Sequence, residues 1–466
     1  MYQIDFQKPV HVYFVGIGGI SMSGLAEILR DRGFKVSGSD RSASPLTERL
    51  AGEGITVHIG QRAENITEDI DLAVFTAAIH PDNPEYVRIM ELGIPSLTRA
   101  QLLGQIMKNY EIPVAISGTH GKTTTTSMLS EMLLEAGQDP TLSIGGNLAS
   151  IGGNVRIGQG SCFVAEACEY TNSFLSLFPK IAIILNIDAD HLDFFKDLDD
   201  IRASFARFAA LLPEDGTLII NGSIPDLDQI TKGLSCRIIT FGNSPEYDYY
   251  ADEIHYDEKG HPVFRIRSGK AVEGDDLQIS LGVPGEHNIY NAVAAVAAAD
   301  LLGISRRDAA AGLAHFGGAG RRFQSMGTLN GAAVIDDYAH HPTEIAATLR
   351  AASKLPHDRI ICVFQSHTFS RTKALMHEFA EALTLADLPI LADIYPARET
   401  DNLGISAETL RDEIRALGHE CLYFPSFEEI ENFLRSNCQK GDLLITMGAG
   451  NIDTVAKDLV SDGQEA

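Results

Sequence analysis

Residues 114–126, VAISGTHGKTTTT, combine a short apolar run, a turn with two glycines and a Lys-Thr pair. The apolar run ending at Ile116 predicts a buried strand, and the apolar pairs within residues 128–133 predict a helix after the turn. Backbone N–H groups of such a strand–turn–helix unit point at phosphate oxygens. The Lys122 ammonium adds a positive charge, and the Thr123 hydroxyl is a ligand for Mg²⁺. The stretch therefore predicts a nucleotide phosphate site in an α/β fold.

The loop departs from the usual phosphate-binding pattern G-x-x-x-x-G-K-[ST]. Ile116 occupies the position of the first glycine, and the first glycine present is Gly118, so the loop is shorter. This departure argues against an ordinary kinase or GTPase and disfavours a P-loop phosphotransferase. A turn that merely contains Gly-Lys-Thr is the alternative, but the strand before it and the helix after it favour phosphate binding.

Composition narrows the classes of function. The chain has 466 residues, enough for two to four domains, and a net charge of −26. A nucleic-acid partner is not expected, because binding to that backbone needs clustered Lys and Arg. No apolar run is long enough to span a bilayer, and residues 1–9 lack a signal-peptide pattern. We therefore expect a cytoplasmic protein without a membrane partner. The six cysteines are scattered and predict reduced thiols.

The N-terminal segment has the layout of a nucleotide-binding βαβ unit. Residues 9–24, PVHVYFVGIGGISMSG, predict a strand, a glycine turn and a helix, and a second strand ends at Asp40. Asp40 lies where a dinucleotide fold places its ribose-binding acid, so a nicotinamide dehydrogenase is one interpretation. The dinucleotide fingerprint, however, requires glycine where Ser21 stands. The segment alone leaves the identity of the nucleotide open.

Polar side chains follow two predicted strands of the middle segment. Strand 163–165 leads into Glu166, and strand 181–185 is followed by Asp190 and His191. Ligands gather at the carboxyl ends of strands in parallel sheets, so these groups are expected near Lys122 as partners of Mg²⁺ and a triphosphate. The alternatives are a solvated carboxylate and an ordinary loop histidine.

Residues 217–278 carry no recognisable motif. Residues 282–291, GVPGEHNIYN, lead into an Ala-rich helix predicted over 292–302, so His287 and Asn288 lie just before or at its start. Asn288 is a candidate ligand contact, but it could instead cap the helix.

The C-terminal segment repeats the pattern of strand followed by polar residues. Apolar runs at 333–335, 360–364, 389–392 and 443–447 each end in a polar stretch, which is typical of a doubly wound domain. These stretches contain His340, His341 and Arg371. Ordinary loop polarity is the alternative explanation for these three side chains.

Taken together, the motifs resemble the Mur ligase family, and most closely its alanine-adding members, over essentially the whole chain. The matching motifs are GIGGISMSG at 16–24, SGTHGKTTTT at 117–126, DHLD at 190–193, PGEHNIYNAVAA at 284–295, RRF at 321–323, DDYAHHPTE at 336–344, HTFSRT at 367–372 and MGAGNI at 447–452.

The resemblance implies an α/β fold with three domains. A Rossmann-like UDP-sugar-binding domain would span 1–108, a P-loop ATPase-type domain with a parallel or mixed sheet 109–320, and a Rossmann-like amino-acid-binding domain 321–466. The implied reaction adds L-alanine to the lactyl carboxylate of UDP-N-acetylmuramate through an acyl phosphate. ATP would be the co-substrate, Mg²⁺ the metal, and the protein a monomer or weak homo-oligomer.

The resemblance also implies roles for individual residues. The UDP-sugar would be bound by Gly16, Gly18, Gly19, Ser21, Asp40 and Thr76. ATP would be bound by Gly118, Thr119, His120, Gly121, Lys122, Thr123, Thr124, His287, Asn288 and Arg322. Mg²⁺ would be bound by Thr123, Glu166 and His191, and the amino acid by Tyr338, His341 and Arg371. The catalytic residues would be Lys122, His191, His340 and Arg371.

Two departures and one rival accompany the resemblance. Many alanine-adding relatives carry aspartate where Cys168 stands, and many carry arginine at Thr368, which places more of the amino-acid carboxylate contact on Arg371. Several Mur ligases use a carbamylated lysine after the DHLD-like motif, but residues 197–212 contain no lysine. A murein-tripeptide ligase of the same fold, with a larger amine substrate, is the nearest rival. Because the motifs are spread over three domains, we expect domain closure to assemble the site.

Overall fold

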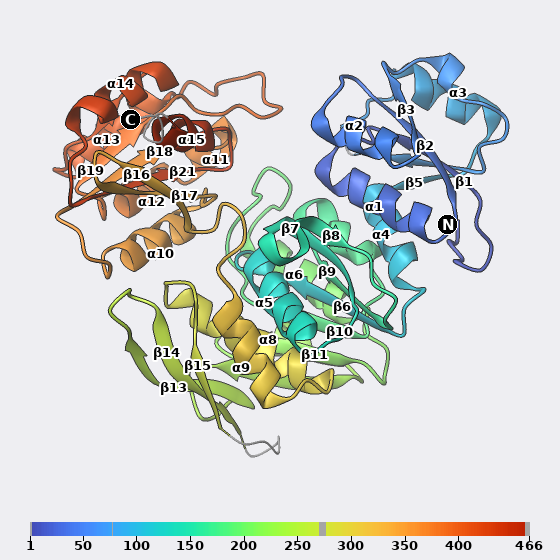
Figure 1. Ribbon diagram of the computed structural model, residues 1–466, viewed down its shortest axis with the longest axis horizontal. Coiled ribbons are helices and arrows are strands. Elements are labelled where there is room, and N and C mark those ends of the chain that lie inside the picture. Colours follow the sequence, from blue (N-terminus) through green and yellow to red (C-terminus); the bar gives the residue numbers. More distant parts are fainter. Residues whose placement is uncertain (1, 77, 270–275, 462–466) are drawn as a thin grey trace.

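The computed structural model describes residues 2–76, 78–269 and 276–461, and it contains three β-sheets in succession along the chain (Figure 1). The N-terminal and C-terminal sheets lie on either side of the top of the view, and the central one lies below them. The architecture is a parallel-dominated α/β fold, as the sequence predicts.

The N-terminal sheet is parallel and has the strand order β3-β2-β1-β4-β5. Its strands are β1 (His11–Val15), β2 (Lys35–Asp40), β3 (Thr56–Ile59), β4 (Leu72–Phe75) and β5 (Ser96–Thr98), and its helices are α1 (Ile20–Asp31), α2 (Pro45–Gly52), α3 (Pro84–Leu92) and α4 (Arg99–Met107), with a 3₁₀ turn at Ala63–Asn65. The chain leaves β1 between β2 and β4, where the strand order reverses. The glycine turn after β1 therefore lies at the position where such sheets bind ligands.

The central sheet is mixed and has the order β15-β14-β13-β12-β11-β10-β6-β9-β7-β8. Its strands are β6 (Ile112–Ser117), β7 (Thr141–Leu148), β8 (Gly153–Arg156), β9 (Cys162–Glu166), β10 (Ile181–Ile184), β11 (Thr217–Asn221), β12 (Arg237–Gly242), β13 (Tyr249–Tyr256), β14 (Pro262–Ser268) and β15 (Leu277–Ser280). Its helices are α5 (Lys122–Glu135), α6 (Leu198–Ala209), α7 (Asp228–Thr231), α8 (His287–Leu301) and α9 (Arg306–His315), with 3₁₀ turns at Ala149–Ile151 and Tyr170–Ser176. Strand β6 pairs in parallel with β9 on one side and β10 on the other, so the loop that follows it also lies at a switch point.

Helix α8 begins earlier than the sequence predicts. It starts at His287 rather than at residue 292, and its first-turn neighbour Asn288 lies inside it. Residues 292–299 are all buried, since the helix packs against α5 and against the sheet. This stretch of α8 is apolar on all its faces, as is typical of a helix that is covered on every side.

The C-terminal sheet has the order β16-β17-β21-β18-β19-β20, with β16 the antiparallel edge strand. Its strands are β16 (Gln324–Leu329), β17 (Ala332–Asp337), β18 (Arg359–Phe364), β19 (Leu388–Leu391), β20 (Leu422–Tyr423) and β21 (Asp442–Met447). Its helices are α10 (Pro342–Ala352), α11 (Phe369–Ala374), α12 (Met376–Leu383), α13 (Ala407–Ala416), α14 (Phe427–Asn437) and α15 (Asp453–Ser461). The polar segments after β17, β18 and β21 all leave the same edge of the sheet.

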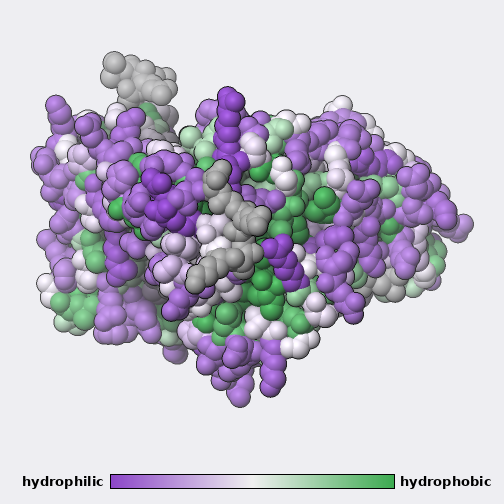
Figure 2. Space-filling view, turned by 90° about the horizontal axis from the view of Figure 1, so that it is seen from below, coloured by the Kyte–Doolittle hydropathy of each residue, from purple (hydrophilic) through white to green (hydrophobic). Residues whose placement is uncertain are grey.

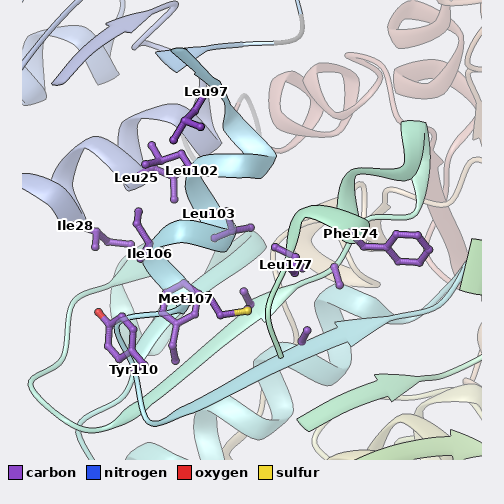
Figure 3. Packing of buried hydrophobic residues seen from close by; sticks show 14 of the residues in the cluster. Leu25, Ile28, Leu97, Leu102, Leu103, Ile106, Met107, Tyr110, Phe174 and Leu177 are labelled. Atoms are coloured by element: carbon purple, nitrogen blue, oxygen red, sulfur yellow. The ribbon is translucent and has the colours of Figure 1, made fainter. Parts of the chain in front are cut away.

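The N-terminal and central sheets share one hydrophobic cluster (Figure 3). Helix α4 contributes Leu103 and Met107, which lie beside Leu177 of the central sheet's covering layer. Gly104 of α4 lies against the backbone of Ser176 so closely that a methyl group would overlap its carbonyl oxygen. The joint between these two domains is therefore tightly packed.

One face of the molecule is predominantly hydrophilic. Figure 2 shows one face, seen from below, on which purple residues surround a smaller hydrophobic area near the middle. Within the described ranges, no helix is both long enough and apolar enough to cross a bilayer.

Candidate functional site

The loop between β6 and α5 has the geometry of a phosphate cradle. Gly118 has φ 143° and Gly121 has φ 85°, and a Cβ on Gly118 would lie 2.9 Å from that of Leu185. Only glycine tolerates both the conformation and the approach. Asn186 fixes the loop, because its Oδ1 accepts a hydrogen bond from the backbone amide of His120 at 2.8 Å. Helix α5 starts at Lys122, so its positive N-terminal end faces the loop.

Lys122 is held inside this loop by oxygen atoms. Its ammonium donates to the carbonyl oxygens of Gly118 at 2.5 Å and Thr119 at 3.0 Å, and to the Glu169 carboxylate at 2.9 Å. Burial alone would lower the pKa of Lys122, but the surrounding acidic groups, Glu169 foremost, together outweigh it, and the pKa is raised. Lys122 is therefore a fixed positive charge at the cradle.

Thr123 and Glu166 form an oxygen pair beside Lys122. The Thr123 hydroxyl donates to Glu166 at 3.2 Å, and the Gly145 amide donates to the other carboxylate oxygen at 2.5 Å. Burial raises the pKa of Glu166 in spite of these donors and Lys122. A half-buried carboxylate next to a hydroxyl at a phosphate loop is an oxygen donor set that suits Mg²⁺.

His191 lies beside Glu169. Its Nε2 is 3.7 Å from Glu169 and 3.8 Å from Asp190. Its ring stacks on Tyr170 with centroids 4.5 Å apart, and burial lowers its pKa. Of the three predicted metal ligands, Thr123 and Glu166 are therefore in contact with each other. The third, His191, lies next to Glu169, the carboxylate that pairs with Lys122.

A cavity of about 330 Å³ opens beside the cradle. It is lined by His287, Asn288 and Arg322, and by apolar side chains that include Phe241 and Phe316. His287 is an exposed residue of this lining, and desolvation by the cavity walls lowers the pKa of its ring. A mainly apolar cavity with a few polar groups, adjoining a phosphate loop, fits the base and ribose of a nucleotide.

Asn288 does not cap helix α8. The N-cap position is Glu286, and the Asn288 amide donates to the carbonyl oxygen of Pro284 at 2.7 Å. Its own side-chain oxygen accepts from Asn291 at 3.1 Å. The capping alternative is therefore wrong, and Asn288 is a wall residue of the cavity.

A second cavity, of about 580 Å³, lies between the central and C-terminal domains. His191 and Asp190 line it from one side, and Tyr338, His340 and Arg371 from the other. The Arg371 guanidinium crosses the boundary to Asp190, with Nε at 3.1 Å and a terminal nitrogen at 3.0 Å. Two predicted catalytic groups from different domains, His191 and Arg371, thus face the same space.

His340 is neutral in this cavity. Burial lowers its pKa to about 4. Its Nδ1 lies 3.1 Å from the carbonyl oxygen of Tyr338, which can only accept, so Nδ1 carries the hydrogen and Nε2 the lone pair. The ring can therefore accept a proton through Nε2.

His341 does not lie with the other predicted amino-acid contacts. It is buried, its Nε2 donates to the carbonyl oxygen of Ala189 at 3.1 Å, and it does not line the cavity that contains Arg371. The neighbouring His340 faces that cavity instead. Because α10 begins directly after His341, the helix turns this side chain towards the central domain.

The predicted UDP-sugar residues meet in the N-terminal domain. The Gly18 amide donates to Asp40 at 2.9 Å, and a Cβ on Gly16 would lie 2.6 Å from the Thr76 methyl group. Gly19 is the N-cap of α1, and Ser21 is exposed in its first turn. One carboxylate oxygen of Asp40 therefore accepts a hydrogen bond from the glycine turn. The dinucleotide interpretation instead requires that this carboxylate bind a ribose hydroxyl.

Three polar residues beside the site were not singled out from the sequence. Glu169 pairs with Lys122, Glu344 lies 3.1 Å from His120 Nδ1, and Asn291 lies against Gly121. Glu344 falls in the first turn of α10, where an acid is also expected for helix stability. The 3.1 Å distance from Glu344 to His120, which belongs to the central domain, is what indicates a role beyond helix stability.

Comparison with known proteins gives consistent matches along the chain. Residues 11–111 match the model described as "Mur ligase family, catalytic domain", 116–299 "Mur ligase middle domain", and 321–450 "Mur ligase, glutamate ligase domain". A UDP-N-acetylmuramate–L-alanine ligase of Lachnospira eligens is 56% identical over 99% of this chain and 100% of its own length. The ligase of the same name from Agathobacter rectalis is 55% identical over 99% and 100%.

Solved structures agree with the sequence matches. The UDP-N-acetylmuramate-alanine ligase of Thermotoga maritima aligns with a TM-score of 0.79 at 27% identity, covering 98% of this chain and 99% of that one. A murein peptide ligase of Psychrobacter arcticus aligns with a TM-score of 0.73 at 26% identity, covering 97% and 98%.

Proposed function

Because this chain belongs to the Mur ligase family, we propose that it joins L-alanine to the lactyl carboxylate of UDP-N-acetylmuramate. The chain is an ATP-dependent ligase of peptidoglycan precursor synthesis. The observation that carries the choice of substrate is its 56% identity, along 99% of its length, to an alanine-adding ligase.

The proposed chemistry has two steps, because a carboxylate is a poor electrophile. A lactyl carboxylate oxygen attacks the γ-phosphorus of ATP, and ADP leaves. The amine of L-alanine then attacks the carbonyl carbon of the acyl phosphate, and inorganic phosphate leaves with the carboxylate oxygen. Water must be excluded between the steps, since an acyl phosphate hydrolyses readily.

Lys122 and the loop amides would stabilise the transferred phosphoryl group. The Lys122 ammonium is charged and fixed by three oxygen atoms, so little reorganisation is needed when phosphate replaces one of them. Preorganised charge of this kind acts on the transition state rather than on the bound substrate alone. His287, Asn288 and Arg322 would hold the remainder of the nucleotide in the adjoining cavity.

Mg²⁺ is the metal that the proposed reaction implies. Thr123 and Glu166 would hold it, since they offer adjacent oxygen atoms at the phosphate loop, while His191 would act beside it through Glu169. When bound, the ion supplies charge neutralisation for the triphosphate. The chain itself supplies the orientation, because the Gly145 amide fixes the Glu166 carboxylate.

The amino acid would bind in the cavity between the central and C-terminal domains. Arg371 is placed to receive its carboxylate, with Tyr338 alongside. The incoming amine must be uncharged when it attacks, and the Nε2 lone pair of His340, whose pKa is about 4, would orient that amine by accepting a hydrogen bond from it. His341, which lies outside this cavity, is not part of the proposal.

The UDP-sugar would bind at the glycine turn of the N-terminal domain, at the carboxyl end of β1. We retain domain ranges of 1–108, 109–320 and 321–466 as part of the proposal, together with a cytoplasmic reaction and a monomer or weak homo-oligomer. No nucleic-acid or membrane partner is proposed for a chain with a net charge of −26.

The test is release of phosphate from ATP in the presence of UDP-N-acetylmuramate and one amine at a time. We expect L-alanine to support turnover, with UDP-N-acetylmuramoyl-L-alanine found by mass spectrometry. The matched control replaces L-alanine with the murein tripeptide, the amine of the rival ligase. Turnover with the tripeptide alone would replace the proposal with that rival, and turnover linked to NAD(P)H would overturn both.

A further inference from the structure

A cluster of polar side chains to which the proposed reaction assigns no chemical step lies between the central and C-terminal domains, beside the nucleotide cavity. His120 Nε2 is 3.3 Å from an oxygen of Asp188, and His341 Nδ1 is 4.0 Å from the same oxygen. One donor atom from each of the three residues lies within 4.8 Å of the others. We propose that His120, Asp188 and His341 form a binding site for a transition-metal ion of the Zn²⁺ class.

The hydrogen bonds around His341 direct a lone pair into the cluster. Its Nε2 lies 3.1 Å from the carbonyl oxygen of Ala189, and that oxygen can only accept, so Nε2 carries the hydrogen. Nδ1 is then unprotonated. Its present partner is the Thr343 amide at 3.3 Å, a long contact that a metal ion would displace at small cost.

His120 has an acidic oxygen at each ring nitrogen. Glu344 lies 3.1 Å from Nδ1 and Asp188 lies 3.3 Å from Nε2. If Nδ1 donates its hydrogen to Glu344, Nε2 of a neutral ring points its lone pair at the Asp188 carboxylate. That contact is repulsive unless a cation lies between Nε2 and Asp188. A proton fills that place in the metal-free protein, and a metal ion would replace it.

The outer contacts of a metal site are already in place. Metal-binding histidines almost always donate their other N–H to a carboxylate or a carbonyl oxygen, and here Glu344 and Ala189 supply those acceptors. Asp188 is fixed as well, since one oxygen accepts from the Ala189 amide and the other from the Thr343 hydroxyl, both at 2.8 Å. The three ligands are therefore oriented before any ion arrives.

The donor set selects the class of ion. Two imidazoles and one carboxylate suit Zn²⁺ and its first-row neighbours, whereas Mg²⁺ prefers oxygen atoms alone. Tetrahedral ligands at about 2.1 Å from Zn²⁺ are about 3.4 Å apart. The 3.3 Å separation between His120 and Asp188 already fits, whereas His341 must move closer, since it lies 4.0 Å from Asp188 and within 4.8 Å of His120. The charge of a divalent ion offsets Asp188 and Glu344 once the His120 proton has left.

The site joins two domains and is open to solvent. His120 and Asp188 belong to the central domain and His341 to the C-terminal one, and Asp188 and His341 also line a surface hollow of about 390 Å³. The Asp188 side chain is 37% exposed, which gives an ion access. A bound ion would hold the two domains together and would slow any step in which they separate.

The test uses Co²⁺ as a spectroscopic probe on the full chain, with excess Mg²⁺ present to occupy the oxygen site at Glu166. We expect one equivalent of Co²⁺ with the visible absorption of a tetrahedral site, about one proton released on binding, and displacement by one equivalent of Zn²⁺. Asp188→Asn and His341→Gln should abolish the band. Glu344→Gln should weaken Co²⁺ binding about 10- to 100-fold.

The matched control is His315→Gln, which removes an exposed histidine bonded to the Glu135 carboxylate and should leave the band unchanged. The absence of a tetrahedral band from the wild-type chain at excess Co²⁺ overturns the proposal whatever the variants do. A band lost in Glu166→Gln but kept in Asp188→Asn also overturns it. The result does not depend on alanine-dependent turnover, so this site and the proposed reaction can fail separately.

Discussion

Replacing Lys122 with alanine tests the phosphoryl-transfer role of the cradle. Lys122 is a half-buried, charged group held by Gly118, Thr119 and Glu169, and removing one preorganised donor to a developing negative charge costs about 10²- to 10³-fold in kcat. We expect steady-state ADP formation by Lys122→Ala to fall by at least about a hundredfold. Binding of the UDP-sugar should persist, because the residues proposed for it lie in another domain.

The structure also predicts a stability effect that can be separated from the catalytic one. Lys122→Ala leaves the buried Glu169 carboxylate without its cation, and breaking a buried pair in this way costs about 3–5 kcal/mol. The double variant Lys122→Ala/Glu169→Gln removes the unpaired charge, so its urea midpoint should recover while its turnover stays low. Near-normal turnover in the single variant, or turnover that returns with stability in the double variant, would refute this reasoning.

Three further predictions concern other parts of the molecule. Arg371→Lys replaces a guanidinium that Asp190 orients with a single ammonium, which cannot hold the L-alanine carboxylate through two nitrogens, so the KM for L-alanine should rise roughly 10- to 100-fold; an unchanged KM in initial-rate assays would remove Arg371 from amino-acid binding. His340 has a folded pKa of about 4 against about 6.5 unfolded, so the unfolded chain binds the proton first and stability falls as pH drops from about 6.5 through 4; urea midpoints in His340→Gln should depend less on pH, and an equal slope would contradict this. Gly104→Ala should cost about 1–3 kcal/mol by overpacking against Ser176, and a neutral change in urea unfolding would mean that the joint can relax.

Local patterns predicted the elements that carry the proposed chemistry. The strand before Gly118 and the helix after it are present as β6 and α5, because apolar periodicity and glycine positions are properties of the local sequence. The sequence predicts the start of α8 five residues late. Residues 287–291 include a histidine and two asparagines, which are not typical of a buried helix, yet Asn288, Ile289 and Asn291 are buried in its first turns. Residues 217–278 gave no motif, yet their described part includes β11–β14, and β15 begins at 277 within the same extension of the sheet.

Contacts across the domain boundary could not be predicted from the sequence. His340 and His341 are adjacent, and only the direction of α10 decides that one faces the cavity with Arg371 and the other faces Ala189. The pairing of His120 with Glu344 joins residues 224 positions apart. Such pairings depend on how folded domains meet, which no local spacing encodes. The expected closure on ligand binding stays a prediction, which small-angle scattering with and without ligands would test.

The most direct test of the account follows one oxygen atom. With both oxygens of the lactyl carboxylate of UDP-N-acetylmuramate labelled with ¹⁸O, attack on ATP places a labelled oxygen between carbon and phosphorus, and attack by L-alanine then cleaves the carbon–oxygen bond. The account predicts one ¹⁸O in each inorganic phosphate released, measured by ³¹P NMR or mass spectrometry in step with amide formation. Amide formation with unlabelled phosphate would contradict carboxylate activation by phosphoryl transfer, and with it the role proposed for the Lys122 cradle.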